Sequence, residues 1–168
     1  GQTMLVLSQA GDPRGGTPQT AAGWFEKAAA AGDPEALTRL AELCADGRGV
    51  PADPAKGAAL RRRAAEAGHA PAAYDLGLMY LSGQGVTAYP LEAARLFERA
   101  AAAGHVPAML QLGDMYFAGE GVFRDAARAV SLYDAAAAAD DRAAGIACRV
   151  FAAGPEDCRD PARAARYC

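Results

Sequence analysis

Residues 71–105 read PAAYDLGLMYLSGQGVTAYPLEAARLFERAAAAGH. A first helix is expected from Pro71 to Leu81, because small and apolar residues recur there at helical spacing. Gly83 should end it, since glycine adopts the left-handed conformation at low cost. A second helix is expected from Pro90 to Ala103, before Gly104. Its inner face carries Ala93, Leu96, Phe97, Ala100 and Ala101. The stretch therefore predicts a hairpin of two helices.

The features of this hairpin return every 36 residues along the chain. The clearest series are Gly32, Gly68 and Gly104; Gly47, Gly83 and Gly119; Leu40, Leu76 and Leu112; and Val50, Val86 and Val122. Runs of alanine and few β-branched residues favour closely packed helices over a sheet. We therefore predict an all-α fold, a right-handed α-solenoid of tandem antiparallel helix hairpins.

The period predicts where the helices lie. The expected pairs are 34–45 with 54–67, 71–81 with 90–103, and 106–118 with 126–139. Residues 1–20 are expected to form an N-terminal arm or a truncated repeat, and residues 21–168 the solenoid. The last unit, 139–168, fits only with a 35-residue step and is expected to cap the array with a short helix at 161–167.

Composition excludes several classes of protein. The net charge of -3 does not point to nucleic acid, for which a basic stripe and a high pI would be expected. No apolar run reaches the roughly 20 residues of a membrane span. The chain begins at Gly1 without an initiator methionine, and we expect a processed or cloned N-terminus.

The repeat pattern can be written as two half-motifs. They are Ala72-x-x-x-Leu76-Gly77-x-x-Tyr80-x-x-Gly83-x-Gly85-Val86 and Ala93-x-x-Leu96-Phe97-x-x-Ala100-Ala101-x-x-Gly104-His105. This pattern resembles the Sel-one-like repeat family, a relative of the tetratricopeptide repeats, from Ala21 to Cys168. The resemblance implies a protein that binds another protein and is not an enzyme. The first copy departs from the pattern at Ala41, Cys44 and Arg61, where the family has glycine, tyrosine and an aromatic residue.

Candidate chemical motifs have structural explanations. The loops at 47–52 and 83–88 fit a dinucleotide GxGxxA pattern, but a helix rather than a strand precedes each, so we reject a nucleotide site. His69 and His105 occupy one repeat position, as expected of turn residues rather than of a catalytic base or metal ligand. The run from Arg61 to Arg63 is interpreted as a solvated helix face. We expect no catalytic residue, cofactor or metal.

Three of the four cysteines lie in the capping unit. Cys148 and Cys168 occupy the repeat positions of Gly113 and Tyr133, which face each other across a hairpin, so Cys148–Cys168 is the first choice of disulfide and Cys148–Cys158 the second. Cys44 is expected to be a buried free thiol. A disulfide would imply an oxidising compartment such as the periplasm, whereas four reduced cysteines would suit the cytoplasm.

A partner protein is expected on the concave side of the solenoid. The outward positions of the first helices are Arg39, Glu42, Tyr74, Asp75, Leu78, Gln111, Asp114 and Phe117. The favoured function is an exported immunity protein that neutralises a secreted antibacterial toxin such as a phospholipase. An envelope adaptor for signalling or assembly is the alternative, and a penicillin-binding or β-lactamase-like enzyme is an alternative of another class. Because the surface is outward, Tyr74→Ala with Asp114→Arg is expected to weaken binding without changing stability.

Overall fold

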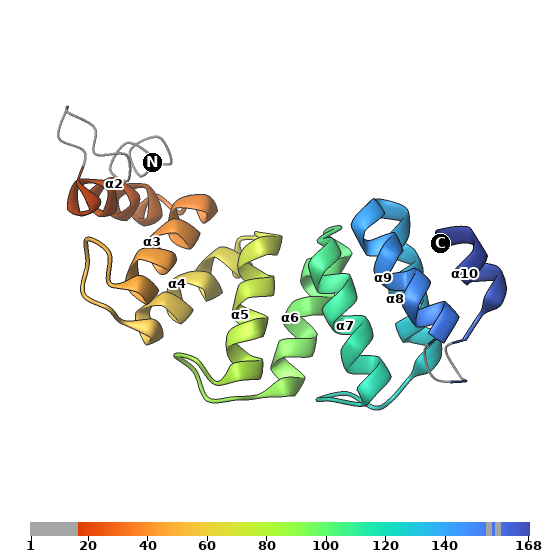
Figure 1. Cartoon of the computed structure of the whole chain (residues 1–168). Helices are drawn as coiled ribbons and strands as arrows, with labels where there is room; N and C mark the ends of the chain where they lie inside the picture. Colours follow the sequence, from red (N-terminus) through yellow and green to blue (C-terminus); the bar gives the residue numbers. More distant parts are fainter. Residues whose placement is uncertain (1–16, 154–155, 157–158) are drawn as a thin grey trace. The chain divides into compact units, whose positions relative to one another are not determined.

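The computed structural model describes residues 17–153, 156 and 159–168, and within them every helix or strand is an α-helix. In chain order the helices are α2 (Pro18–Ala30), α3 (Pro34–Asp46), α4 (Pro54–Glu66), α5 (Ala70–Ser82), α6 (Pro90–Ala102), α7 (Val106–Ala118), α8 (Ala126–Ala139), α9 (Asp141–Ala153) and α10 (Pro161–Tyr167) (Figure 1). The predicted all-α class is confirmed. Each helix of the three predicted pairs lies within one residue of its expected bounds.

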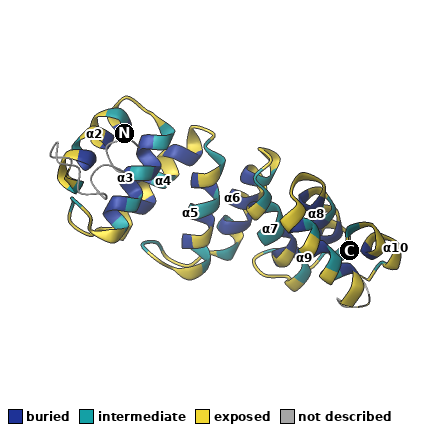
Figure 2. Ribbon diagram, turned by 45° about the horizontal axis from the view of Figure 1, so that its top comes forward, coloured by how far each residue is buried: buried dark blue, intermediate teal, exposed yellow. Residues whose placement is uncertain are grey.

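The chain divides into two compact units, Gly1–Ala88 and Tyr89–Cys168. The first unit contains α2 to α5 and the second contains α6 to α10. In each unit the buried residues follow the faces that the helices turn toward one another (Figure 2). Most of the N-terminal arm predicted at 1–20 lies outside the described residues, which begin at residue 17, and α2 starts at Pro18.

Side-chain caps fix the helix starts. The carboxylates of Asp33, Asp53 and Asp125 accept backbone N–H groups of the first turns of α3, α4 and α8. Thr17 and Thr20 form a capping box at the start of α2. These N–H groups have no partner inside their own helices. Because the caps satisfy them, each helix begins at the residue that the sequence pattern predicts.

The second glycine of each repeat loop is required for close packing. At Gly85, φ is +73° and an added Cβ would lie 2.5 Å from the carbonyl oxygen of Pro54, in the first turn of α4. An added Cβ at Gly49 or Gly121 would meet the backbone of Pro18 or Pro90 at a similar distance. The Gly-x-Gly-Val motif thus brings each loop against the start of an earlier helix, which is a structural role.

The run from Arg61 to Arg63 is exposed at Arg62 and Arg63, as interpreted, but the interpretation as a solvated face is wrong for Arg61. The Arg61 side chain is only 11% exposed, and its Nε lies 3.7 Å from an oxygen of Asp75 on α5. Arg62 donates a hydrogen bond to the hydroxyl of Tyr80 on α5. Arg63 donates to the carbonyl of Ala29 at the end of α2, at 3.3 Å. Successive side chains on a helix point in different directions, and these three reach α5 and the end of α2.

In the second unit, a glycine allows α7 and α8 to approach. An added Cβ at Gly113 would lie 3.0 Å from the ring of Tyr133, which is 2% exposed. The Tyr116 hydroxyl donates to Glu98 on α6 at 2.8 Å and accepts from Arg128 on α8 at 2.9 Å. One tyrosine on α7 therefore links the helices on either side of it.

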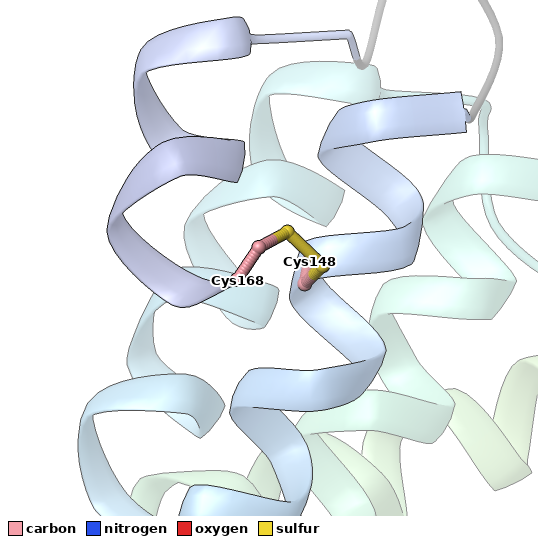
Figure 3. The surroundings of a disulfide bond; sticks show 2 residues. All are labelled: Cys148 and Cys168. Atoms are coloured by element: carbon pink, nitrogen blue, oxygen red, sulfur yellow. A yellow bond between two sulfur atoms is a disulfide. The ribbon is translucent and has the colours of Figure 1, made fainter.

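The C-terminal hairpin of α9 and α10 is joined by a disulfide between Cys148 and Cys168, the pair that the sequence favours (Figure 3). The ring of Tyr167 stacks on that of Phe151 with centroids 6.0 Å apart. Arg163 forms a 2.9 Å ion pair with Asp134 on α8. Cys158, the alternative partner of Cys148, lies outside the described residues. Covalent and noncovalent contacts together hold the seven-residue α10 in place.

Candidate protein-binding surface

In the first unit, the expected binding residues lie on α3 and α5. On α3, the Arg39 guanidinium forms ion pairs with Glu35 and Glu42, each at 3.1 Å. The hydrogen bond with Glu42 is the main cause that raises the pKa of Arg39. These three charged side chains therefore pair with one another within α3.

On α5, Asp75 and Leu78 line a depression of about 550 Å³. Arg61 and Pro54 of α4 line it too, together with Met79. The Leu78 side chain is 36% exposed, whereas Met79 is 8% exposed. The depression therefore combines an apolar wall with one guanidinium and one carboxylate, 3.7 Å apart.

Tyr74 directly precedes Asp75 in the sequence, and its side chain is half-buried. Burial, and then the negative charge of Asp75, raise the pKa of the Tyr74 hydroxyl above its ordinary value.

In the second unit, Gln111, Asp114 and Phe117 lie on α7. Asp114 is exposed, and it accepts a 2.6 Å hydrogen bond from the part-buried Tyr133 hydroxyl. The guanidinium of Arg124 lies over the Phe117 ring at 5.7 Å, and its Nε donates to the Phe117 carbonyl at 3.1 Å.

The hydrogen bond to Asp114 corrects the expectation that binding and stability separate at this residue. Asp114→Arg removes an acceptor of the part-buried Tyr133 hydroxyl, which costs free energy in the folded state. The continuity of the first-unit and second-unit residues as one groove stays a prediction.

Arg61 is a residue of the depression that sequence reasoning missed. The signal was present, because Arg61 stands where the other repeats have Phe97 and Tyr133. Gly57, one turn before it, stands where they have Ala93 and Ala129, and an added Cβ there would lie 3.4 Å from an Arg61 nitrogen. The glycine thus leaves room for the guanidinium.

The histidine position has a structural role at the start of α5. The Nδ1 of His69 accepts the N–H of Ala72 at 3.3 Å, and its Nε2 lies 3.3 Å from a carboxylate oxygen of Glu35. In the part of the chain that the structure describes, no group of three or more His, Cys, Asp or Glu side chains could hold a metal ion. None of the described helices is long and apolar enough to span a membrane.

The Sel1 repeat model matches residues 11–33, 34–69, 70–105 and 106–141. The chain belongs to the Sel1 repeat family. The copies matched at 34–69, 70–105 and 106–141 begin where α3, α5 and α7 begin, so each repeat starts at the start of a helix. Sel1 repeats mediate protein–protein interaction. The comparison with curated proteins finds no match.

Solved structures support the same fold. A Sel1 repeat protein from Oxalobacter formigenes is 31% identical with a TM-score of 0.82, and the match covers 96% of this chain and 66% of that one. A protective antigen of uropathogenic Escherichia coli strains, with an SLR fold, is 25% identical with a TM-score of 0.83 over 96% of this chain and 35% of that one. Cysteine rich protein B of Helicobacter pylori is 26% identical with a TM-score of 0.52, covering 54% and 69%. The chain thus spans two thirds or less of the length of the first two.

Proposed function

We propose that this Sel1 repeat chain is a non-enzymatic module that holds a partner protein at the depression of the first unit. The observation that carries the proposal is the meeting of Leu78, Asp75 and Arg61 around one hollow. Apolar area that leaves water on binding supplies affinity, and the flanking charges select the partner and its orientation.

The favoured partner is a secreted antibacterial toxin, such as a phospholipase, which the chain would neutralise as an immunity protein in the periplasm. The disulfide between Cys148 and Cys168 supports an oxidising compartment. An envelope adaptor would use the same surface with a different partner.

A growth experiment tests the immunity role. A candidate toxin, a secreted antibacterial phospholipase, is expressed in the periplasm of a sensitive host, with and without the exported chain. We expect the chain to restore growth, and Leu78→Glu to abolish the rescue. Trp24→Glu, at an exposed apolar residue of the first unit that lies outside the depression, is the control and should still rescue. If the exported chain does not reduce killing by the toxin, the immunity role is rejected in favour of the adaptor.

The enzyme alternative has its own test. Turnover of nitrocefin, or acylation by a labelled penicillin, would support a β-lactamase-like or penicillin-binding activity. We expect neither, because Ser82 and Ser131 lie in no Ser-x-x-Lys sequence and Ser82 donates its hydroxyl to the Leu78 carbonyl at 3.0 Å.

A further inference from the structure

A second hollow, of about 720 Å³, lies in the second unit where the loop after α7 passes the start of α6. Its walls include Leu91, Tyr116, Val122, Phe123, Arg124 and Arg128. Phe123 is 96% exposed and Leu91 is 37% exposed. A phenylalanine side chain in water contributes nothing to the core, so packing of the fold does not explain it.

Comparison of the repeats shows that these side chains are not part of the repeat pattern. Phe123 stands where the earlier repeats have Pro51 and Thr87. Leu91 stands where the neighbouring repeats have Ala55 and Ala127, and Arg124 where they have Ala52 and Ala88. Three side chains that are larger than those at the same positions of the other repeats therefore line one hollow.

Two arginines at this hollow are held in defined positions. Arg124 lies over the Phe117 ring at 5.7 Å and bonds the Phe117 carbonyl. Arg128 donates to the Tyr116 hydroxyl at 2.9 Å, and its Nε lies 3.3 Å from Asp125. Since Asp125 is the single acidic residue of the lining, the hollow carries an excess of positive charge in a chain whose net charge is -3.

We propose that the Phe123 patch (Leu91, Val122, Phe123, Arg124 and Arg128) binds a protein segment in which an apolar side chain stands beside carboxylates. The apolar side chain would pack on Phe123 and Leu91. The carboxylates would pair with the two guanidinium groups, whose planar forks match that geometry. Positioned arginines lose less conformational entropy on binding than free ones. An anionic bilayer is the less favoured occupant, because Asp125 and the negative net charge of the chain repel it.

Selection from a phage library of random linear peptides on the intact protein tests this. The strongest clone is synthesised with a fluorophore, and its affinity is measured for wild type, Phe123→Thr and Arg124→Glu. We expect enriched peptides to join an aromatic or aliphatic residue to Asp or Glu, and each variant to weaken binding by about tenfold or more. Binding should fall as salt rises, because the ion pairs are exposed.

Two controls keep the result specific to this patch. Trp24→Ala removes an aromatic that is 54% exposed in the first unit, and should leave peptide affinity unchanged. Because Phe123 is almost fully exposed, Phe123→Thr should melt at the wild-type temperature. Leu78→Glu should also leave peptide affinity unchanged, so this proposal and the one for the first unit succeed or fail separately.

Several outcomes would overturn the proposal. One is enrichment of peptides without acidic residues, and another is equal affinity for wild type and Phe123→Thr. Binding to vesicles of anionic phospholipid that Phe123→Thr abolishes would assign the patch to a membrane. Concentration-dependent dimerisation that the same substitution abolishes would assign it to a second copy of the chain.

Discussion

At the scale of single residues, Asp114 shows that a side chain can face outward and still support the core. The helical period places it on the outer face of α7, and that placement is readable from sequence. Its donor Tyr133 lies 19 residues later, and the hydroxyl reaches it only because α7 and α8 pack closely at Gly113. Contacts of this kind depend on the packing of two helices, so the sequence pattern does not reveal them.

The Asp114–Tyr133 hydrogen bond is expected to contribute about 1 kcal/mol to the free energy of unfolding, since one partner is charged but exposed. Asp114→Ala and Tyr133→Phe should each destabilise the protein, and the double variant should lose less than the sum. Urea unfolding of the four proteins measures the coupling. Gln111→Ala, on the same helix, is the control and should be nearly silent. Additive losses would mean that the bond contributes nothing.

A glycine pair tests the close contact between α7 and α8. Gly113→Leu should cost about 1–3 kcal/mol or more, because the new side chain meets the Tyr133 ring. Gly145→Ala, where an added Cβ meets nothing within 4 Å, should stabilise α9 by up to about 1 kcal/mol. Thermal melting compares them. Two variants that melt at the same temperature would place the helix contact elsewhere.

Cys44 is expected to react slowly with thiol reagents in the folded protein. Burial is the largest cause that raises the pKa of its thiol, so the reactive thiolate is scarce at neutral pH. Alkylation by iodoacetamide should accelerate strongly in denaturant. The protonated form is favoured by folding, so any stability linked to this thiol is present at neutral pH and declines as pH rises through the folded pKa. Rapid alkylation under native conditions would contradict the buried position.

At the scale of helices, the residues that begin and end each helix allowed the helix bounds to be predicted from the sequence. An Asp-Pro pair at the start and a glycine after the end predict the bounds of α3 and α4. The 36-residue period then predicts the bounds of the later helices. Thr17-Pro18 is the same kind of start signal, yet the surrounding glycines and prolines concealed it, and α2 was not predicted as a helix. The contacts of the Arg61–Arg63 run were also missed, because their partners Tyr80 and Ala29 are distant in sequence.

The disulfide is expected to stabilise α10 more than any other helix. It closes a loop between residues 20 apart, for which the loss of chain entropy in the unfolded state corresponds to about 3 kcal/mol. Cys148→Ser with Cys168→Ser should raise amide exchange in α10 and α9. Exchange in α3 and α4, which belong to the first unit, should stay the same. A uniform increase across both units would show instead that the disulfide acts on the whole fold.

At the scale of the whole molecule, repetition explains both what the sequence predicts and what it hides. Residues that follow the period, such as Leu76 and Gly83, build the hairpins and could be assigned in advance. Residues that break the period, such as Arg61 and Phe123, line the two hollows. The repeat pattern gives no role to residues that depart from it. Only the folded structure shows that several such residues lie close together.

Site-specific photo-cross-linking in the native cell tests whether the depression of the first unit holds a partner protein. A benzophenone side chain replaces Leu78, and in parallel it replaces Ala59, an exposed residue of α4. A third version carries it in place of Phe123. We expect a discrete cross-linked protein at position 78, none at position 59, and loss of the adduct when Asp75→Arg is added. An adduct at position 59, or none at position 78 in cells where the position-123 version forms one, would contradict the proposal.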